Sequence, residues 1–131
     1  MEKQLSELDA VLKALADPTR VRLLTLLLAG EVCVCHLYES LKLPQSMTSR
    51  HLAYLRRAGL VSTSKRGLWV YYTLAEHENP AIQAVIAAVL QSAAGLPGAR
   101  KDFARLEAKT GCCVPAGVMA SPATTARTEK R

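Results

Sequence analysis

Two short helical patterns on either side of a tight turn constrain this chain more than any other feature. The first pattern runs from about Val34 to Leu41 and places its apolar residues on one face. Residues 42–45, Lys-Leu-Pro-Gln, turn the chain, and a second helical pattern then runs from Ser46 to Ala58. Gly59 is expected to end this second helix. Short helices joined by so tight a turn predict a helix-turn-helix unit.

Two further helices are predicted before this unit. Leucine and valine recur at helical spacing among charged residues up to Leu15, which indicates an amphipathic helix with one apolar stripe. Asp17 and Pro18 then form an N-cap and first-turn signature, and the strongly apolar helix that follows is expected to end at Gly30. The apolar content of this second helix makes it the expected centre of the core.

A hairpin and terminal helices are predicted after the unit. Residues 60–74, LVSTSKRGLWVYYTL, hold two runs of strand-forming residues around a Lys65-Arg66-Gly67 turn, which predicts a hairpin with a basic tip. Pro80 begins a last strong helix, and Leu96-Pro97-Gly98 separates it from a shorter polar helix near Arg100 to Ala108. The predicted fold is therefore mainly α-helical with a β-hairpin wing, a winged helix-turn-helix. The hairpin's aromatic residues, expected to be packing elements, are Trp69, Tyr71 and Tyr72.

Length and composition indicate one domain. A chain of 131 residues that is 50% hydrophobic can build a single core, which is expected over residues 1–109, with a flexible tail at 110–131 that is rich in Ala, Pro and Thr. The N-terminus lacks the apolar core and cleavage site of an export signal, and the longest apolar run is too short for a membrane span. These features predict a cytoplasmic protein without a membrane partner. The net charge of +6 is compatible with a polyanionic partner.

Four stretches of this sequence together resemble a known family. They are ALADPTRVRLLTLL, EVCVCHLYESL, QSMTSRHLAYLRRAGLV and KRGLWVYYTL, and they cover most of residues 13 to 75. The chain resembles the ArsR/SmtB family of bacterial repressors over this region. The resemblance implies a winged helix-turn-helix that binds double-stranded operator DNA.

The resemblance also implies that the second helix of the unit contacts DNA. Side chains near the start of such a helix reach base edges in the major groove, where Arg50 could bind a guanine through two hydrogen bonds. Basic residues at the wing tip would contact backbone phosphate instead. Without the resemblance, a solvated surface would be the better interpretation of the arginines of this helix. The predicted DNA contacts are Gln45, Ser46, Ser49, Arg50, His51, Tyr54, Arg57, Lys65 and Arg66.

A homodimer is expected. Helix-turn-helix proteins usually bind inverted repeats as two-fold dimers, because one head of this size makes few contacts. The apolar faces of the first helix and of the Pro80 helix exceed what one short winged domain can cover, and the resemblance implies an interface on the terminal helices. The predicted interface residues are Leu5, Leu8, Leu12, Ile82, Val85 and Val89.

Two of the four cysteines lie at the start of the first helix of the unit. Thiols in the cytosol stay reduced, so a metal-binding or redox role is favoured over a structural disulfide. Backbone N–H groups at a helix N-terminus favour the thiolate forms of Cys33 and Cys35. Residues two apart in a regular helix point away from each other, so joint binding of one ion requires that this first turn be irregular or unwind. Such a distortion would disturb the element that supports the DNA-contacting helix.

The segment GEVCVCHL resembles the sensing motif of arsenical repressors, which implies that trivalent arsenic or antimony is bound through sulfur. The arsenical pattern often has a third cysteine where this chain has Tyr38. Cys112 and Cys113 could supply the missing ligand from the tail of the same chain or of the partner chain, or they could be incidental thiols. A methylated trivalent arsenical would need only two thiols. No cofactor is expected for folding, and His36 is not expected to be a ligand.

Other functions remain open at this stage. Related sensors of cadmium and lead also use a Cys-x-Cys on this helix, whereas zinc and nickel sensors place His and acidic ligands on the last long helix, and residues 80–92 contain none. A thiol redox sensor is the more serious rival, because two nearby thiolates can form a disulfide. An enzyme is not expected, since His36, His51 and His77 lie on dissimilar elements and no phosphate loop or catalytic triad pattern is present. A module that binds only protein would leave the basic surface unexplained.

Overall fold

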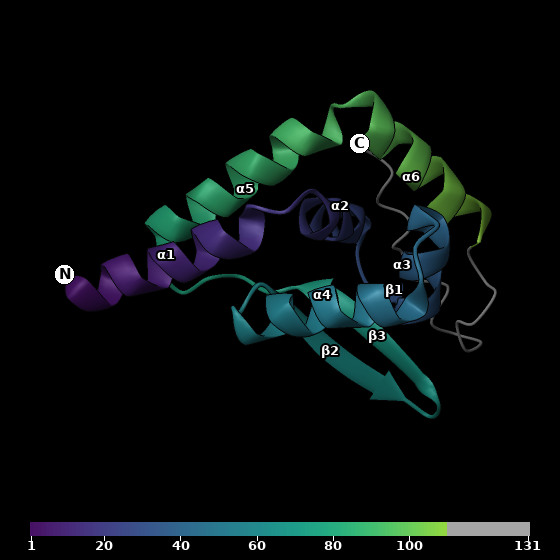
Figure 1. Ribbon diagram of the computed structural model, residues 1–131, viewed down its shortest axis with the longest axis horizontal. Coiled ribbons are helices and arrows are strands. Elements are labelled where there is room, and N and C mark those ends of the chain that lie inside the picture. Colours follow the sequence, from purple (N-terminus) through teal and green to yellow (C-terminus); the bar gives the residue numbers. More distant parts are fainter. Residues whose placement is uncertain (110–131) are drawn as a thin grey trace.

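The computed structural model describes residues 1–109 of this chain, and it has the predicted winged helix-turn-helix architecture (Figure 1). The predicted tail at 110–131, which carries Cys112 and Cys113, lies outside the described residues. The elements are α1 (Glu2–Leu15), α2 (Pro18–Leu26), the 3-10 helix η1 (Leu27–Ala29), β1 (Val32–Cys33), α3 (Val34–Leu41), α4 (Gln45–Arg57), β2 (Val61–Arg66), β3 (Trp69–Leu74), α5 (Pro80–Ala94) and α6 (Pro97–Ala108).

The signals at the helix starts act as predicted. The Asp17 carboxylate accepts a hydrogen bond from the backbone N–H of Arg20 at 3.1 Å, and Pro18 occupies the first helical position. Asn79 caps α5 in the same way ahead of Pro80. The α2 segment ends close to the predicted place, because a 3-10 turn follows Leu26 and leads to Gly30 at a φ of 117°. Only glycine adopts such a backbone angle without strain.

The sheet has three antiparallel strands in the order β1-β3-β2, and β1 was not predicted. This strand is two residues long: Val32 pairs with Tyr72, and Cys33 pairs with Tyr71. Two residues carry no period-2 pattern, so only the tertiary pairing identifies them as a strand. The wing turn also differs from the prediction. Strand β2 continues through Arg66, and the tip is formed by Gly67 and a 92% exposed Leu68.

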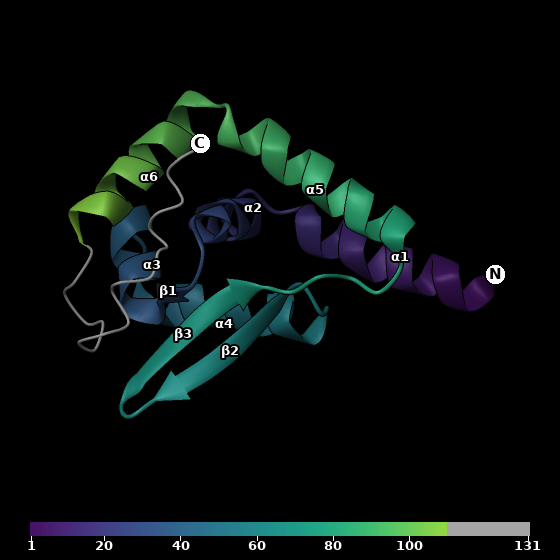
Figure 2. The same cartoon turned by 180° about the vertical axis from the view of Figure 1, so that it is seen from behind.

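Helix α2 lies at the centre of the core. Leu23 and Leu24 are fully buried, and side chains of α1, α4 and α5 pack around them in one apolar cluster. In Figures 1 and 2, α1 and α5 lie side by side on one flank of α2, and the hairpin extends away from them beside α4. The remaining flank of α2 is covered by α6, which also packs on α3. This arrangement fixes α3 and α4 between the terminal helices and the wing.

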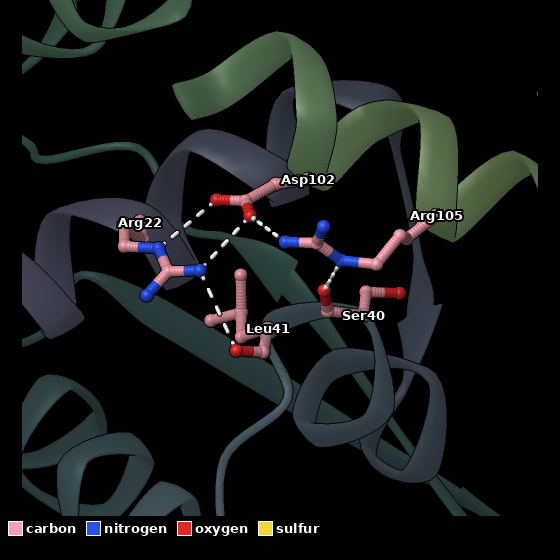
Figure 3. Close-up of polar contacts among 5 residues, drawn as sticks. All are labelled: Arg22, Ser40, Leu41, Asp102 and Arg105. Atoms are coloured by element: carbon pink, nitrogen blue, oxygen red, sulfur yellow. Dashed lines mark hydrogen bonds and ion pairs between the residues drawn. The ribbon is translucent and has the colours of Figure 1, made fainter. Parts of the chain in front are cut away.

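A buried carboxylate attaches α6 to this core (Figure 3). Asp102 is 3% exposed and accepts two hydrogen bonds from Arg22 of α2, at 3.0 and 2.9 Å, and one from Arg105 at 2.8 Å. Arg105 also donates to the backbone carbonyl of Ser40, near the end of α3. The predicted polar helix begins earlier than expected, because Pro97 takes its first position. Through Asp102, α6 therefore connects α2 to the helix that carries Cys35.

Within residues 1–109, no single helix is long and apolar enough to cross a membrane. Helices α5 and α6 meet the criteria of length and composition only when they are taken together, and they are bent by 85° relative to each other. Core helices of water-soluble proteins meet the same criteria.

Candidate DNA interface and dithiol site

One face of α4 is exposed at its N-terminal end. Leu52 and Leu55 are buried in the core, and this orientation leaves the opposite face to solvent. Pro44 precedes the helix without a side-chain cap, so the first backbone N–H groups of α4 remain available to an anion such as a phosphate. The predicted contacts that are exposed on α4 are Gln45, Ser46, Ser49, Arg50 and Arg57.

Two other predicted contacts on α4 are half-buried. His51 and Tyr54 both lie against the guanidinium of Arg20, which extends from α2. Arg57 also approaches the Tyr54 ring, with its Cζ atom 6.0 Å from the ring centroid. The part of Tyr54 that faces Arg20 is therefore engaged within the protein.

The wing separates the two basic residues that were predicted at its tip. Lys65 is exposed. Arg66 turns back toward the body of the protein, where Nη2 lies 2.6 and 2.7 Å from the carboxylate oxygens of Glu31. Its Cζ atom is 4.5 Å from the centroid of the Tyr71 ring. In this structure Arg66 is therefore not the free tip residue that the hairpin pattern predicted, because a buried ring and a carboxylate hold it.

Cys33 and Cys35 lie close together without any unwinding of a helix. Cys33 ends β1 and has an extended backbone as the N-cap of α3, whereas Cys35 is the second helical residue. Their Sγ atoms are 3.3 Å apart. The irregular first turn that joint binding requires is thus already present at the N-cap, so the expected unwinding is unnecessary. Cys33 is 1% exposed and Cys35 is half-buried, so the pair lies in a largely protected setting.

Tyr71 of the wing forms the wall of this dithiol site. It is buried, lies opposite Cys33 in the β1–β3 ladder, and packs with both cysteines. Its expected role in packing is confirmed. The place of Tyr71 beside the cysteines could not be predicted, because β1 is too short to be recognised from sequence.

The dithiol site offers two candidate ligands within the described residues, Cys33 and Cys35. No group of three or more His, Cys, Asp or Glu side chains there could hold a metal ion.

His36 is buried on α3. This burial lowers the pKa of His36 below its ordinary value, and the effect is larger than the opposing one of the Glu39 carboxylate, which raises the pKa. The C-terminal end of α6 lies beside the same helix, since Lys109 Nζ is 3.7 Å from a carboxylate oxygen of Glu39.

The predicted dimer residues differ in what they offer to a partner. Leu5 and Leu12 on α1 are 53% and 47% exposed, although both are large and apolar. Leu8, Val85 and Val89 are half-buried. Ile82 is 4% exposed and belongs to the core of the protomer. It therefore has little surface left for a partner, because the helical face it occupies points at the core.

The fold and the exposed α4 face define a class: this is a winged helix-turn-helix transcriptional regulator. A family model described as "Bacterial regulatory protein, arsR family" matches residues 17–63. The arsenic resistance transcriptional regulator ArsR1 of Pseudomonas putida is 54% identical over 66 residues, which cover 49% of this chain and 51% of that protein. The chain thus matches about half the length of that relative.

A second relative covers more of the chain. The transcriptional activator HlyU of Vibrio cholerae is 44% identical over 82 residues, 63% of this chain and 76% of that protein. Its solved structure superposes with a TM-score of 0.62 at 39% identity, over 70% of this chain and 97% of that one. The homodimeric winged helix-turn-helix domain of Mb0332 from Mycobacterium bovis superposes with a TM-score of 0.60 at 28% identity, over 70% and 82% of the two chains. The chain belongs to the ArsR family of bacterial regulatory proteins.

Proposed function

We propose that this protein is a transcriptional repressor that binds an inverted-repeat operator as a homodimer and dissociates when a trivalent arsenical binds Cys33 and Cys35. The arsenical is arsenite, antimonite or a methylated As(III) species. The observation that carries the proposal is the 3.3 Å separation of the two Sγ atoms at the N-cap of α3, the helix that precedes α4. Operator DNA implies action in the cytoplasm, where thiols stay reduced.

The dithiol site suits a soft ion. Thiolate sulfur prefers soft acceptors, and within the described residues no His, Asp or Glu joins the two cysteines in a group of three that could hold a metal ion. The ion can reach the half-buried Cys35 first, and the burial of Cys33 then shields the bound ion and its sulfur bonds from water. A relative is named for arsenic resistance, which agrees with this preference.

Binding at the site is expected to act on the two DNA-contacting elements together. Cys33 belongs to β1, which pairs with β3 of the wing, and Cys35 belongs to α3, which packs on α4. An ion held by both sulfurs would form two bonds of about 2.3 Å, each shorter than the 3.3 Å contact between the sulfurs, and would need room beside Tyr71, which packs with Cys33. The wing and the helix-turn-helix then change their relative positions. By linkage, the operator must weaken ion binding by the same factor by which the ion weakens operator binding.

The contact between Lys109 and Glu39 supports a third ligand from the same chain. Helix α6 brings Lys109 next to Glu39, and Glu39 lies four residues beyond Cys35, or about 6 Å along the axis of α3. Cys112 follows Lys109 by three residues, which span at most about 10 Å when extended. We therefore propose that Cys112 or Cys113 completes a three-sulfur site for an inorganic ion. A methylated arsenical, with one valence held by carbon, needs only Cys33 and Cys35.

A redox sensor is the second candidate, and the same sulfur contact favours it. Hydrogen peroxide would oxidise the two thiols to a disulfide, with loss of two protons and two electrons from the thiols and reduction of the peroxide to two waters. This alternative requires no bound ion. A soft divalent metal, cadmium or lead, is a third effector that two or three thiolates would accept.

The test is fluorescence anisotropy of labelled upstream DNA bound to reduced protein. The complex is titrated separately with arsenite, methylarsenite, cadmium, zinc and peroxide. Release by a trivalent arsenical at the lowest concentration supports the proposal. Release by cadmium or by peroxide alone replaces the arsenical with the corresponding alternative, and absence of DNA binding overturns the repressor function itself.

Two variants separate the roles of the four thiols. Cys33→Ser is expected to keep the operator affinity of the reduced protein and to abolish release. The double variant C112S/C113S is expected to lose the response to arsenite but keep the response to methylarsenite. A full response of Cys33→Ser to arsenite would show that the effector binds elsewhere.

A further inference from the structure

Arg20 of α2 makes polar contacts with two other helices, α1 and the DNA-contacting helix α4. Its side chain is 13% exposed although it is an arginine at a helix start. Its backbone N–H is fixed by the Asp17 carboxylate, so the side chain begins from a defined point. From there the guanidinium reaches two different helices.

On one side, Arg20 binds the C-terminal end of α1. Its Nε donates to the carbonyl oxygen of Ala14 at 2.8 Å, and Nη2 donates to that of Lys13 at 3.0 Å. The last carbonyls of a helix have no partner within that helix, and α1 ends without the left-handed residue that often satisfies them. Arg20 supplies a donor to the Ala14 carbonyl and a second donor to the Lys13 carbonyl, which also accepts from the backbone N–H of Ala16 at 3.3 Å.

On the other side, Arg20 contacts α4. Its Cζ atom is 4.1 Å from the centroid of the Tyr54 ring, and Nη1 is 3.4 Å from Nδ1 of His51. A planar guanidinium can stack on a ring and donate hydrogen bonds from its edge at the same time, which a lysine ammonium cannot do. One side chain therefore fixes the end of α1 and one face of α4 simultaneously.

We infer that Arg20 is a positioning residue that sets the orientation of α4 relative to α1. The arrangement of the two α1 helices in the dimer then determines how the two α4 helices are placed on the DNA. The inference rests on the proposed dimer, whose candidate contacts Leu5 and Leu12 are exposed on α1. Helices α1 and α4 both pack on α2, so the apolar core holds them near each other. The core alone permits small rotations of α4, whereas a stacked and hydrogen-bonded guanidinium resists them.

The consequence concerns half-site spacing. A two-fold dimer binds two half-sites well only if its two recognition helices are separated by the right distance along the DNA. If Arg20 fixes α4 relative to the dimer helix, its loss lets each α4 rotate independently. Binding of one half-site then changes little, whereas simultaneous binding of both half-sites weakens.

The experiment compares Arg20→Gln with Arg22→Gln. Arg22 is on the same helix but is ion-paired with Asp102 of α6 and donates to the Leu41 carbonyl at the end of α3, so it serves as the control for loss of a structural arginine whose polar contacts go to α6 and α3 rather than to α4. Full-length proteins are titrated into three kinds of duplex: the footprinted operator, the operator with one half-site scrambled, and a series in which the half-sites are moved apart or together by single base pairs. Thermal unfolding of each variant is recorded in parallel.

For Arg20→Gln we expect the affinity for the full operator to fall about tenfold, the size of effect that one lost charged hydrogen bond can have. Half-site affinity should change less than about twofold, and the preference for one spacing should flatten. Arg22→Gln should lower the unfolding temperature but keep the wild-type spacing profile. Equal losses on the full operator and the half-site, or an unchanged spacing profile in Arg20→Gln, would overturn the inference.

Two further variants keep the inference testable if Arg20→Gln does not fold. Arg20→Lys preserves the charge and one carbonyl bond but loses the stack, and Tyr54→Leu removes the ring while leaving the α1 contacts. Both should flatten the spacing profile. If both variants bind the operator as tightly as the wild-type protein and keep its spacing profile, the positioning role of Arg20 is refuted and the proposed function is not affected. If the wild-type protein binds no DNA, the proposed function itself is refuted.

Discussion

The buried carboxylate of Asp102 offers the sharpest test of how the fold is held together. Replacing it with Asn keeps the shape of the side chain but removes the charge that two arginines share. The amide also presents an NH₂ group, which can only donate, to guanidinium groups that also only donate. The substitution therefore breaks the attachment of α6 to α2 and to the end of α3.

The expected loss of stability follows from burial. Removing one partner of a fully buried ion pair costs about 3–5 kcal/mol because the other charge is left without compensation. Here the side chains of Arg22 and Arg105 are 39% and 30% exposed, so water can solvate them after the change. We therefore expect a smaller loss, about 2–3 kcal/mol in the free energy of unfolding. For a chain of this size that corresponds to a decrease of about 8–12 °C in unfolding temperature.

Urea denaturation at a fixed protein concentration, followed by circular dichroism, measures this loss. Asp9→Asn is the matched control, because Asp9 pairs with Lys13 on the surface of α1, where both side chains are mostly exposed. That pair should contribute less than about 0.5 kcal/mol. If Asp102→Asn and Asp9→Asn differ by less than about 0.5 kcal/mol, the assigned role of the Asp102 cluster in holding α6 is refuted.

Three other predictions concern DNA binding and pH. Arg50→Ala should lower operator affinity by about tenfold or more without changing the unfolding temperature, as measured by anisotropy and calorimetry, since Arg50 is exposed and would lose a base contact. Glu31→Gln should release Arg66 toward phosphate and raise DNA affinity several-fold at low salt, with a steeper dependence of affinity on salt; an unchanged salt dependence would contradict this role. Burial lowers the pKa of His36, so the folded state holds the neutral ring while the unfolded chain takes up a proton. Stability should therefore fall as pH decreases through the unfolded-state pKa of about 6.5, and His36→Gln should reduce that fall in urea titrations between pH 7.5 and 5.5.

Local patterns predicted most of the secondary structure and part of the candidate site. Asp17-Pro18 and Pro80 mark helix starts whose physical cause lies within one turn of chain, so they are visible in sequence. The alternation of buried and exposed residues along α4 likewise identifies Ser49 and Arg50 as exposed, because Leu52 and Leu55 must face the core. Cys33 and Cys35 stand out by residue type and spacing alone.

The features that only the tertiary structure decided depend on partners far away in the chain. Strand β1 exists because Cys33 pairs with Tyr71, and that pairing places the N-cap so that the two sulfurs touch. Arg66 turns away from the wing tip because its guanidinium pairs with Glu31, the residue that precedes β1. Arg20 looks like an ordinary exposed basic residue in the sequence, yet it is mostly buried between α1 and α4. The periodicity of a sequence shows which face of a helix or strand is apolar. Which partner a charged side chain finds depends on how whole helices and strands pack together, and a local sequence pattern does not show this.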